Sequence, residues 1–79
     1  MNKQRKQRFE DVVGSLEEAK DILSDIRGEE QDAFDAMPEG LQVSERGDKM
    51  QDYIDLMDDC DDKIDDIITF VNEELLRHE

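Results

Sequence analysis

The sequence has few of the residues on which enzymes, membrane proteins and secreted proteins depend. It contains one cysteine, Cys60, one histidine, His78, one proline and no tryptophan. A lone cysteine rules out an intramolecular disulfide and fits a reducing cytosol, and a lone histidine cannot build a catalytic triad or a metal cluster. No apolar run is long enough to span a membrane, and no signal-peptide core follows the first residues. We therefore expect a cytoplasmic protein that is not an enzyme and needs no metal or cofactor.

What the chain has in excess is negative charge. Its 79 residues carry 24 acids against 10 bases, a formal net charge of −14. Four of the bases lie in 1–8, so the net charge from Phe9 onward is −18. Such a surface repels nucleic acid and anionic membranes and attracts basic proteins. Because many charges and few aromatic side chains are typical of disordered chains, the case for a fold depends on the pattern of the apolar residues.

The apolar residues follow a helical pattern in two stretches of similar length. In each stretch they succeed one another at alternating steps of three and four, the heptad repeat of packed helices. The first stretch runs through Phe9, Val12, Leu16, Ala19, Leu23, Ile26, Glu30, Ala33 and Met37. The second runs through Met50, Tyr53, Met57, Cys60, Ile64, Ile67 and Val71. We predict an all-α protein with helices over 4–37 and 44–77, in which Cys60 is a buried apolar side chain.

A short breaker separates the two stretches. Pro38 cannot continue a helix, Gly40 permits a turn, and Ser44 is a suitable N-cap for the second helix. A connection this short returns the chain antiparallel, so we predict a two-helix hairpin, a heptad coiled coil in a single domain over 1–79. Its parts are a basic start at 1–8, whose first residues we expect to fray, a first helix whose heptad register covers 9–37, a turn at 38–43 and a second helix at 44–77. A break at Gly28, which would give three helices, is the alternative.

The apolar face is wider than a seam between two helices requires. One flanking row holds Val13, Ile54, Ile68 and Leu75, and the other holds Ile22, Leu56 and Phe70. Such a face suits a bundle of three or four helices, so we expect two hairpins to pair into a four-helix bundle, as a homodimer. The residues expected in the core or at the dimer contact are Phe9, Val13, Leu16, Leu23, Ile26, Ile54, Met57, Ile64, Ile67, Ile68 and Val71.

The second helix also carries a long stripe of acids on the face opposite the apolar register. Ten acids lie between positions 45 and 66, which is roughly 3.3 Å of helix axis per charge. One strand of duplex DNA carries a phosphate every ~3.4 Å. The stripe therefore predicts binding to the basic surface of a protein that itself binds nucleic acid; the alternative is a solvated face that only keeps the chain soluble. The residues expected to bind the partner are Asp48, Asp52, Asp55, Asp58, Asp59, Asp62, Asp65 and Asp66.

Paired acids on the two helices leave one enzymatic alternative. Glu18 and Asp21 on the first helix, with Asp62 and Asp65 on the second, resemble the acidic motifs of all-α nucleotide pyrophosphatases, which use magnesium. In the heptad register all four point outward, whereas carboxylates that bind a metal in a bundle converge between helices. Pyrophosphatase activity is therefore kept only as a remote alternative.

Three segments carry a further resemblance. They are Ser15-Leu-Glu-Glu-Ala-Lys-Asp-Ile-Leu, the stretch from Ile26 through the turn phrase Met37-Pro-Glu-Gly-Leu-Gln, and Ser44-Glu-Arg-Gly. Together they hold 30 of the 79 residues, and they resemble small acidic helical proteins encoded by bacteriophages and prophages. The resemblance implies a phage or prophage origin and a bacterial cytosol, and it transfers no functional residues. Small acidic phage proteins often inhibit host or defence machinery such as CRISPR effectors and restriction enzymes, sometimes by imitating DNA, so the resemblance implies an inhibitor. A dimeric helical scaffold is the alternative function.

Overall fold

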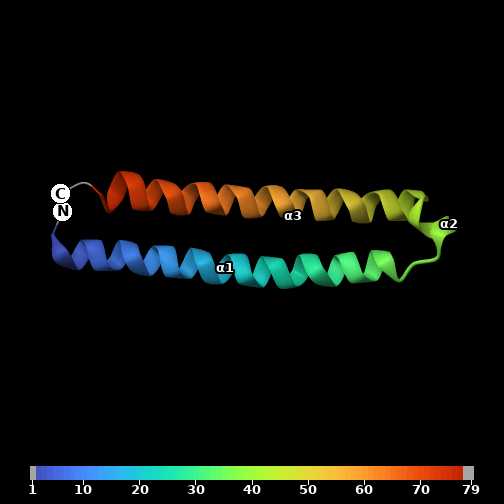
Figure 1. Ribbon diagram of the computed structural model, residues 1–79, viewed down its shortest axis with the longest axis horizontal. Helices are drawn as coiled ribbons and strands as arrows, with labels where there is room; N and C mark the ends of the chain where they lie inside the picture. The colour runs from blue at the N-terminus through green and yellow to red at the C-terminus, as the bar shows by residue number, and fades with distance from the viewer. Residues whose placement is uncertain (1, 78–79) are drawn as a thin grey trace.

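Residues 2–77, the part of the chain that the computed structural model describes, are all-helical, as the sequence predicted (Figure 1). Most of them belong to two long helices, α1 (Lys3–Asp35) and α3 (Glu45–Phe70). A short helix, α2 (Glu39–Gln42), lies between them, and a π-helical segment, η1 (Val71–Leu75), continues α3. His78 lies outside the described residues.

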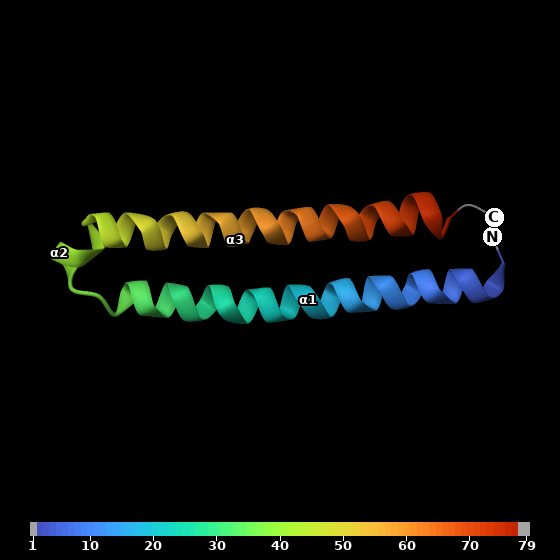
Figure 2. The same cartoon turned by 180° about the vertical axis from the view of Figure 1, so that it is seen from behind.

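The two long helices form a narrow rod. α1 and α3 lie side by side and run in opposite directions in both views (Figure 1, Figure 2). The rod measures 59 × 16 × 11 Å. The start of α1 and the segment η1 lie at one end, here called the terminal end, and α2 lies at the other, here called the connection end.

α1 begins earlier than the sequence predicted. Asn2 caps it, because its Oδ1 atom accepts a hydrogen bond of 2.9 Å from the backbone N–H of Arg5. The basic start is therefore helical from Lys3 onward, where fraying was expected. α1 then runs without interruption through Gly28, so the three-helix alternative is wrong.

α1 ends at Asp35, two residues before the predicted position. The last carbonyl groups of a helix have no partner within it. Here the side chain of Gln42 supplies one, since its Nε2 atom donates hydrogen bonds of 3.1 Å to the carbonyl oxygens of Phe34 and Met37. The connection thus folds back against the end of α1.

The start of α3 depends on a glycine rather than on the serine that the sequence indicated. Ser44 occupies the N-cap position, but its hydroxyl donates to the carbonyl of Leu41 and makes no capping bond to α3. Gly47 is buried, and a Cβ atom there would lie 2.7 Å from the carbonyl oxygen of Leu41 and closer still to that of Gln42. Only glycine allows the connection to approach the first turn of α3 this closely.

The side chains that face one another between α1 and α3 form the seam. On α1 the seam consists of the partly buried residues Phe9, Val13, Leu16, Lys20, Leu23, Arg27, Glu30 and Phe34. On α3 and the start of η1 it consists of Gly47, Met50, Ile54, Met57, Asp61, Ile64, Ile68 and Val71. Among the described residues, the apolar side chains that are fully buried are Ile54 and Val71, at 2% and 5% exposure.

This seam corrects the predicted register. On each helix, one of the two predicted rows lies in the seam. The other predicted row is exposed, and the residues one position later in the sequence lie in the seam instead. The displaced residues are Val12, Ala19, Ile26 and Ala33 on α1, and Tyr53, Cys60 and Ile67 on α3. Two members of the set predicted for the core or the dimer contact, Ile26 and Ile67, are therefore 48% and 50% exposed in the single chain, and Cys60 is exposed where burial was predicted. The predicted register did not include Lys20 and Arg27, whereas both are partly buried in the seam, as long side chains with an apolar stem can be.

Candidate interaction surfaces

Two cations of α1 bind acids of α3 on one broad side of the rod. The guanidinium of Arg27 contacts Asp58 at two points, with Nε 2.8 Å from Oδ1 and Nη2 3.3 Å from Oδ2. The ammonium of Lys20 binds Asp65 and lies 3.8 Å from Asp61. Two residues of the predicted partner-binding set, Asp58 and Asp65, are thus engaged within the chain.

These contacts shift the pKa values of the groups that make them. The hydrogen bond from Arg27, helped by its charge, lowers the pKa of Asp58 below the ordinary value of 3.8. The hydrogen bond to Asp65, helped by the charges of the neighbouring acids, raises the pKa of Lys20 above 10.5. Because all four side chains remain partly exposed, water screens the pairs and their contribution to stability is small.

The same broad side shows which residues of the two helices lie together. A hollow of about 130 Å³ on this side is lined by Ser24 and Asp58, which directly follow the seam residues Leu23 and Met57. Both helices are right-handed and they run antiparallel, so residues that follow the seam in this way share one side. By the same geometry, residues that directly precede a seam residue, such as Val12 before Val13 and Tyr53 before Ile54, share the opposite side.

That opposite side is apolar and exposed. Its apolar side chains, here called the apolar edge, are Val12, Ala19, Ile22, Ile26 and Ala33 of α1 and Tyr53, Leu56, Cys60, Ile67 and Phe70 of α3. The seven large side chains among them are between 44% and 61% exposed. Contiguous exposed patches of this kind mark interaction sites, because single apolar residues scattered over a surface are common but a continuous strip is not.

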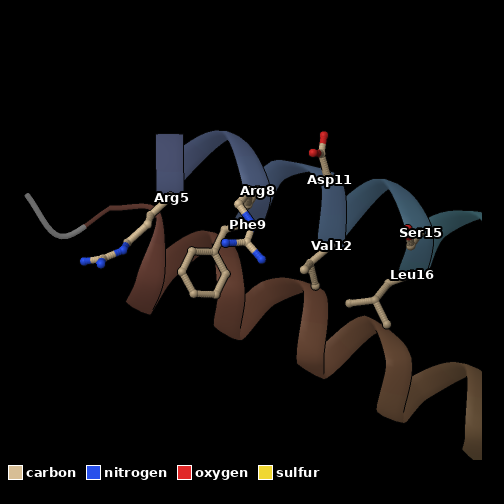
Figure 3. Close-up of a pocket in the computed structure, with 7 residues that line it drawn as sticks. All are labelled: Arg5, Arg8, Phe9, Asp11, Val12, Ser15 and Leu16. Carbon is tan, nitrogen blue, oxygen red and sulfur yellow. The ribbon is translucent and has the colours of Figure 1, made fainter. Parts of the chain in front are cut away.

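At the terminal end the apolar edge widens into a groove along α1. The groove has a volume of about 630 Å³ and is lined by Arg5, Arg8, Phe9, Asp11, Val12, Ser15 and Leu16 (Figure 3). Phe9, Val12 and Leu16 project toward α3, whereas Asp11 points away from it. All of the lining residues come from one helix, so this is an open side of α1 and not an enclosed cavity.

The acids occupy the remaining faces. The acidic face, as we define it, consists of the exposed outer residues of α3: Glu45, Asp48, Asp52, Asp55, Asp59, Asp62 and Asp66. The corresponding exposed residues of α1 are Asp11, Glu18, Asp21, Asp25, Asp32 and Asp35. The structure narrows the predicted stripe, because Asp61 lies in the seam and Asp58 and Asp65 bind cations. The outward charges of α3 are therefore about 5 Å apart along the helix axis, instead of roughly 3.3 Å.

Three of the α3 carboxylates gather closely at mid-rod, which the predicted register did not foresee. One oxygen from each of Asp61, Asp62 and Asp65 lies within 4.8 Å of the others. The ammonium of Lys20 already lies against two of these acids and supplies them with a positive charge. Glu18 and Asp21, the acids of α1 in the pyrophosphatase motif, are not part of this group.

No family model, curated protein or solved structure matches the chain. None of the described helices has a stretch long and apolar enough to cross a membrane. Inferences about function therefore depend on two surfaces, the acidic face and the apolar edge, which lie on different sides of the rod.

Proposed function

We propose that the chain is a non-catalytic interaction protein, a helical hairpin whose acidic face binds the basic, nucleic-acid-binding surface of another protein. The supporting observation is the acidic face itself, seven exposed acids in rows along α3. A surface of this charge is attracted to a cationic groove and repels nucleic acid, so the partner is a protein. The chain acts by occupying the place that nucleic acid otherwise takes.

The rod shape suits this role. Exposed acids line the outer rows of α3 from end to end, so a line of negative charge runs along one side of a narrow body, as phosphates run along a DNA strand. A spacing of about 5 Å per charge on α3 is wider than the ~3.4 Å between phosphates of one DNA strand. The likeness to DNA thus lies in the line of charge and not in a match of each acid to a phosphate.

The residue type supports a role beyond solubility. Aspartate forms helices less readily than glutamate, which would supply the same charge. Like charges four residues apart, such as Asp55 and Asp59 or Asp62 and Asp66, also destabilise a helix. A face that only kept the chain soluble would not need these unfavourable choices. Given the resemblance to phage proteins, we place the partner among the host or defence proteins of a bacterial cytosol, for example a CRISPR effector or a restriction enzyme.

The proposal is tested by affinity capture from nuclease-treated bacterial lysate. The test variant changes five acids of the acidic face to asparagine: Asp52, Asp55, Asp59, Asp62 and Asp66. None of the five makes a direct ion pair with Lys20 or Arg27, although the charge of Asp55 acts on Arg27, so the contacts between the helices are left in place. We expect the wild type to retain proteins that bind nucleic acid, to release them in high salt or on addition of duplex DNA, and the variant to lose them.

A matched control removes the same charge from the other helix. It carries the five amide substitutions Asp11→Asn, Glu18→Gln, Asp21→Asn, Asp25→Asn and Asp32→Asn, and circular dichroism checks that both variants remain helical. Retention of the partner by this control, with loss in the α3 variant, identifies the acidic face as the binding surface. Equal retention by the wild type and the α3 variant contradicts the proposal.

The apolar edge supports a second candidate function, a helical scaffold or regulator that holds a partner through apolar contacts. In that case binding resists salt, survives the five asparagine substitutions and fails when an edge residue becomes charged, as in Leu56→Asp. Ile54→Asp and Ile68→Asp, in the flanking row that the sequence predicted, are unsuitable for this test. Both residues lie in the seam, so these changes would unfold the chain instead of probing its surface.

A further inference from the structure

We infer that the apolar edge is covered by the apolar edge of a second copy of the chain, with the two connection ends at opposite ends of the dimer. The product is an antiparallel four-helix bundle with the acidic faces on its outside. This inference goes beyond the acidic-face proposal and does not depend on it, because it concerns a different side of the rod and is read out by oligomeric state.

The size of the apolar edge matches what a stable dimer needs. Its seven large side chains are about half exposed, and at about 150 Å² each, the lower end of the range for aromatic side chains, on the order of 500 Å² of apolar surface is open to water. A standard protein interface buries about 800 Å² from each partner. The edge extends over both helices, from Val12 and Phe70 near the terminal end to Ala33 and Tyr53 near the connection end.

The single chain also lacks a sufficient core of its own. Among residues 2–77, Ile54 and Val71 are the fully buried apolar side chains, and the seam gives positions to Lys20, Arg27 and Asp61. Small helical chains with so little buried surface are usually stabilised by assembly. In a four-helix bundle each helix uses two seam rows and one neighbouring row, and that neighbouring row is what the apolar edge provides. A self-complementary face of this kind favours a two-fold dimer over a foreign partner.

The net charges of the two ends of the rod favour one direction of this pairing. The two rows of α1 and α3 that carry the apolar edge contain a single acid, Glu29, and five cations, so two edges meet without bringing acids together, and the long cationic side chains at the ends of the rows must turn outward toward the surrounding acids. The ends of the rod differ in sign. Residues 29–49 at the connection end hold seven acids and two bases, whereas 3–8 and η1 at the terminal end together hold four bases and two acids, Glu73 and Glu74. Placing the connection end of one copy over the terminal end of the other brings opposite charges together, and it also covers the groove beside Phe9 and Val12.

The first test is sedimentation equilibrium of the full chain over a wide range of concentration. We expect a dimer for the wild type and a monomer for Ile67→Asp, because Ile67 is at the apolar edge and its replacement places a charge there. The matched control is Val43→Asp, which puts the same charge on a residue that is 82% exposed but lies outside the edge, and this variant should remain a dimer. A wild type that stays monomeric, or a Val43→Asp variant that dissociates as Ile67→Asp does, overturns the inference.

The second test needs no substitution that could unfold the chain. Cys60 is exposed in the single chain and belongs to the apolar edge, so its thiol reports directly on whether that face is covered. We expect its rate of reaction with a small disulfide reagent to fall as wild-type concentration rises through the dimerisation range, while circular dichroism shows unchanged helicity. A thiol that reacts equally fast at every concentration shows that the edge is open in the dimer or that no dimer forms, and either result overturns the inference.

The third test concerns direction. In a chain with Cys60→Ser and Val43→Cys, spin labels mark the connection end of each copy. Opposed copies place the two labels at a separation close to the 59 Å length of the rod, whereas copies with both connections at one end place them close together. A short separation contradicts the opposed arrangement. Failure of the lysate capture, by contrast, changes none of these readouts, so the two proposals are judged separately.

Discussion

The packing at the connection end makes a sharp prediction about two glycines in helices. Alanine is preferred to glycine inside a helix by about 1 kcal/mol, so Gly→Ala in an exposed helix is expected to stabilise. Gly14 meets this condition, since a Cβ atom added there has nothing within 4 Å. At Gly47 the same atom would lie 2.7 Å or less from backbone oxygens of the connection, where ordinary contact begins near 3.4 Å. The two substitutions should therefore have opposite signs.

The size of the expected loss of stability follows from the backbone shift that Gly47→Ala requires. To accept the methyl group that Gly47→Ala adds, the backbone at Leu41 and Gln42 has to retreat, and overpacking of this kind costs about 1–3 kcal/mol. The retreat also strains the two hydrogen bonds that Gln42 donates to the end of α1, each worth about 0.5–1.5 kcal/mol. Allowing for the gain in helix propensity, we expect Gly47→Ala to destabilise by about 2–4 kcal/mol and Gly14→Ala to stabilise by up to about 1 kcal/mol.

The assay is thermal unfolding followed by circular dichroism, with all chains at one concentration because assembly makes the melting temperature depend on it. At about 4–8 °C per kcal/mol for a chain of this size, Gly47→Ala should melt at least ~8 °C below the wild type. Gly14→Ala should melt at the same temperature as the wild type or higher. If Gly47→Ala is as stable as the wild type, the connection does not pack on α3 as described, and the reasoning is refuted.

Three further predictions concern the seam and the charges. Ile54→Ala, at the most buried apolar position, should lower the free energy of unfolding by about 2–4 kcal/mol in urea, whereas Val43→Ala, in the exposed connection, should change it by less than about 0.5 kcal/mol; equal effects would contradict the seam. Because Arg27 lowers the pKa of Asp58, the ionised carboxyl stabilises the fold above pH 3.8, and this stabilisation is lost as the pH falls through the lowered pKa. The difference in unfolding free energy between the wild type and Asp58→Asn, measured with urea, should therefore be present at neutral pH and disappear in acid. With 24 acids against 10 bases, added sodium chloride should raise the urea midpoint by screening self-repulsion, and a lower midpoint in salt would show that attractive pairs outweigh it.

Local rules were sufficient for the elements of the fold. Alternating steps of three and four separate apolar from polar positions on any helix, and proline stops a helix in nearly any context. The all-helical class, the two long helices and the interruption near Pro38 therefore followed from the sequence, as did the exposed outer acids of α3. Boundaries were less accurate, since α1 begins at Lys3 through the Asn2 cap and ends at Asp35.

The rotation of each helix about its axis could not be read in the same way. Apolar residues flank the shared row on both sides, so rows through Val12 or Val13 and through Ile67 or Ile68 satisfy the same periodicity. The choice depends on packing between residues far apart in the chain, above all around the buried Ile54 and Val71, and the partly exposed pairs of Lys20 with Asp65 and Asp61 are compatible with it. A prediction that keeps charged residues out of the seam misses Lys20 and Arg27. Both are partly buried there, and their charged ends contact acids of the other helix.

By itself, then, the sequence determined that this chain forms two amphipathic helices with a strongly acidic exterior, because helix periodicity and charge are local properties. Only the tertiary structure decided that Cys60, Ile26 and Ile67 lie on an open apolar edge, that Asp58 and Asp65 bind cations, and that Gly47 has no room for a side chain. Each of these depends on how one helix is turned toward the other, and that rotation is set by side-chain packing between residues distant in the sequence.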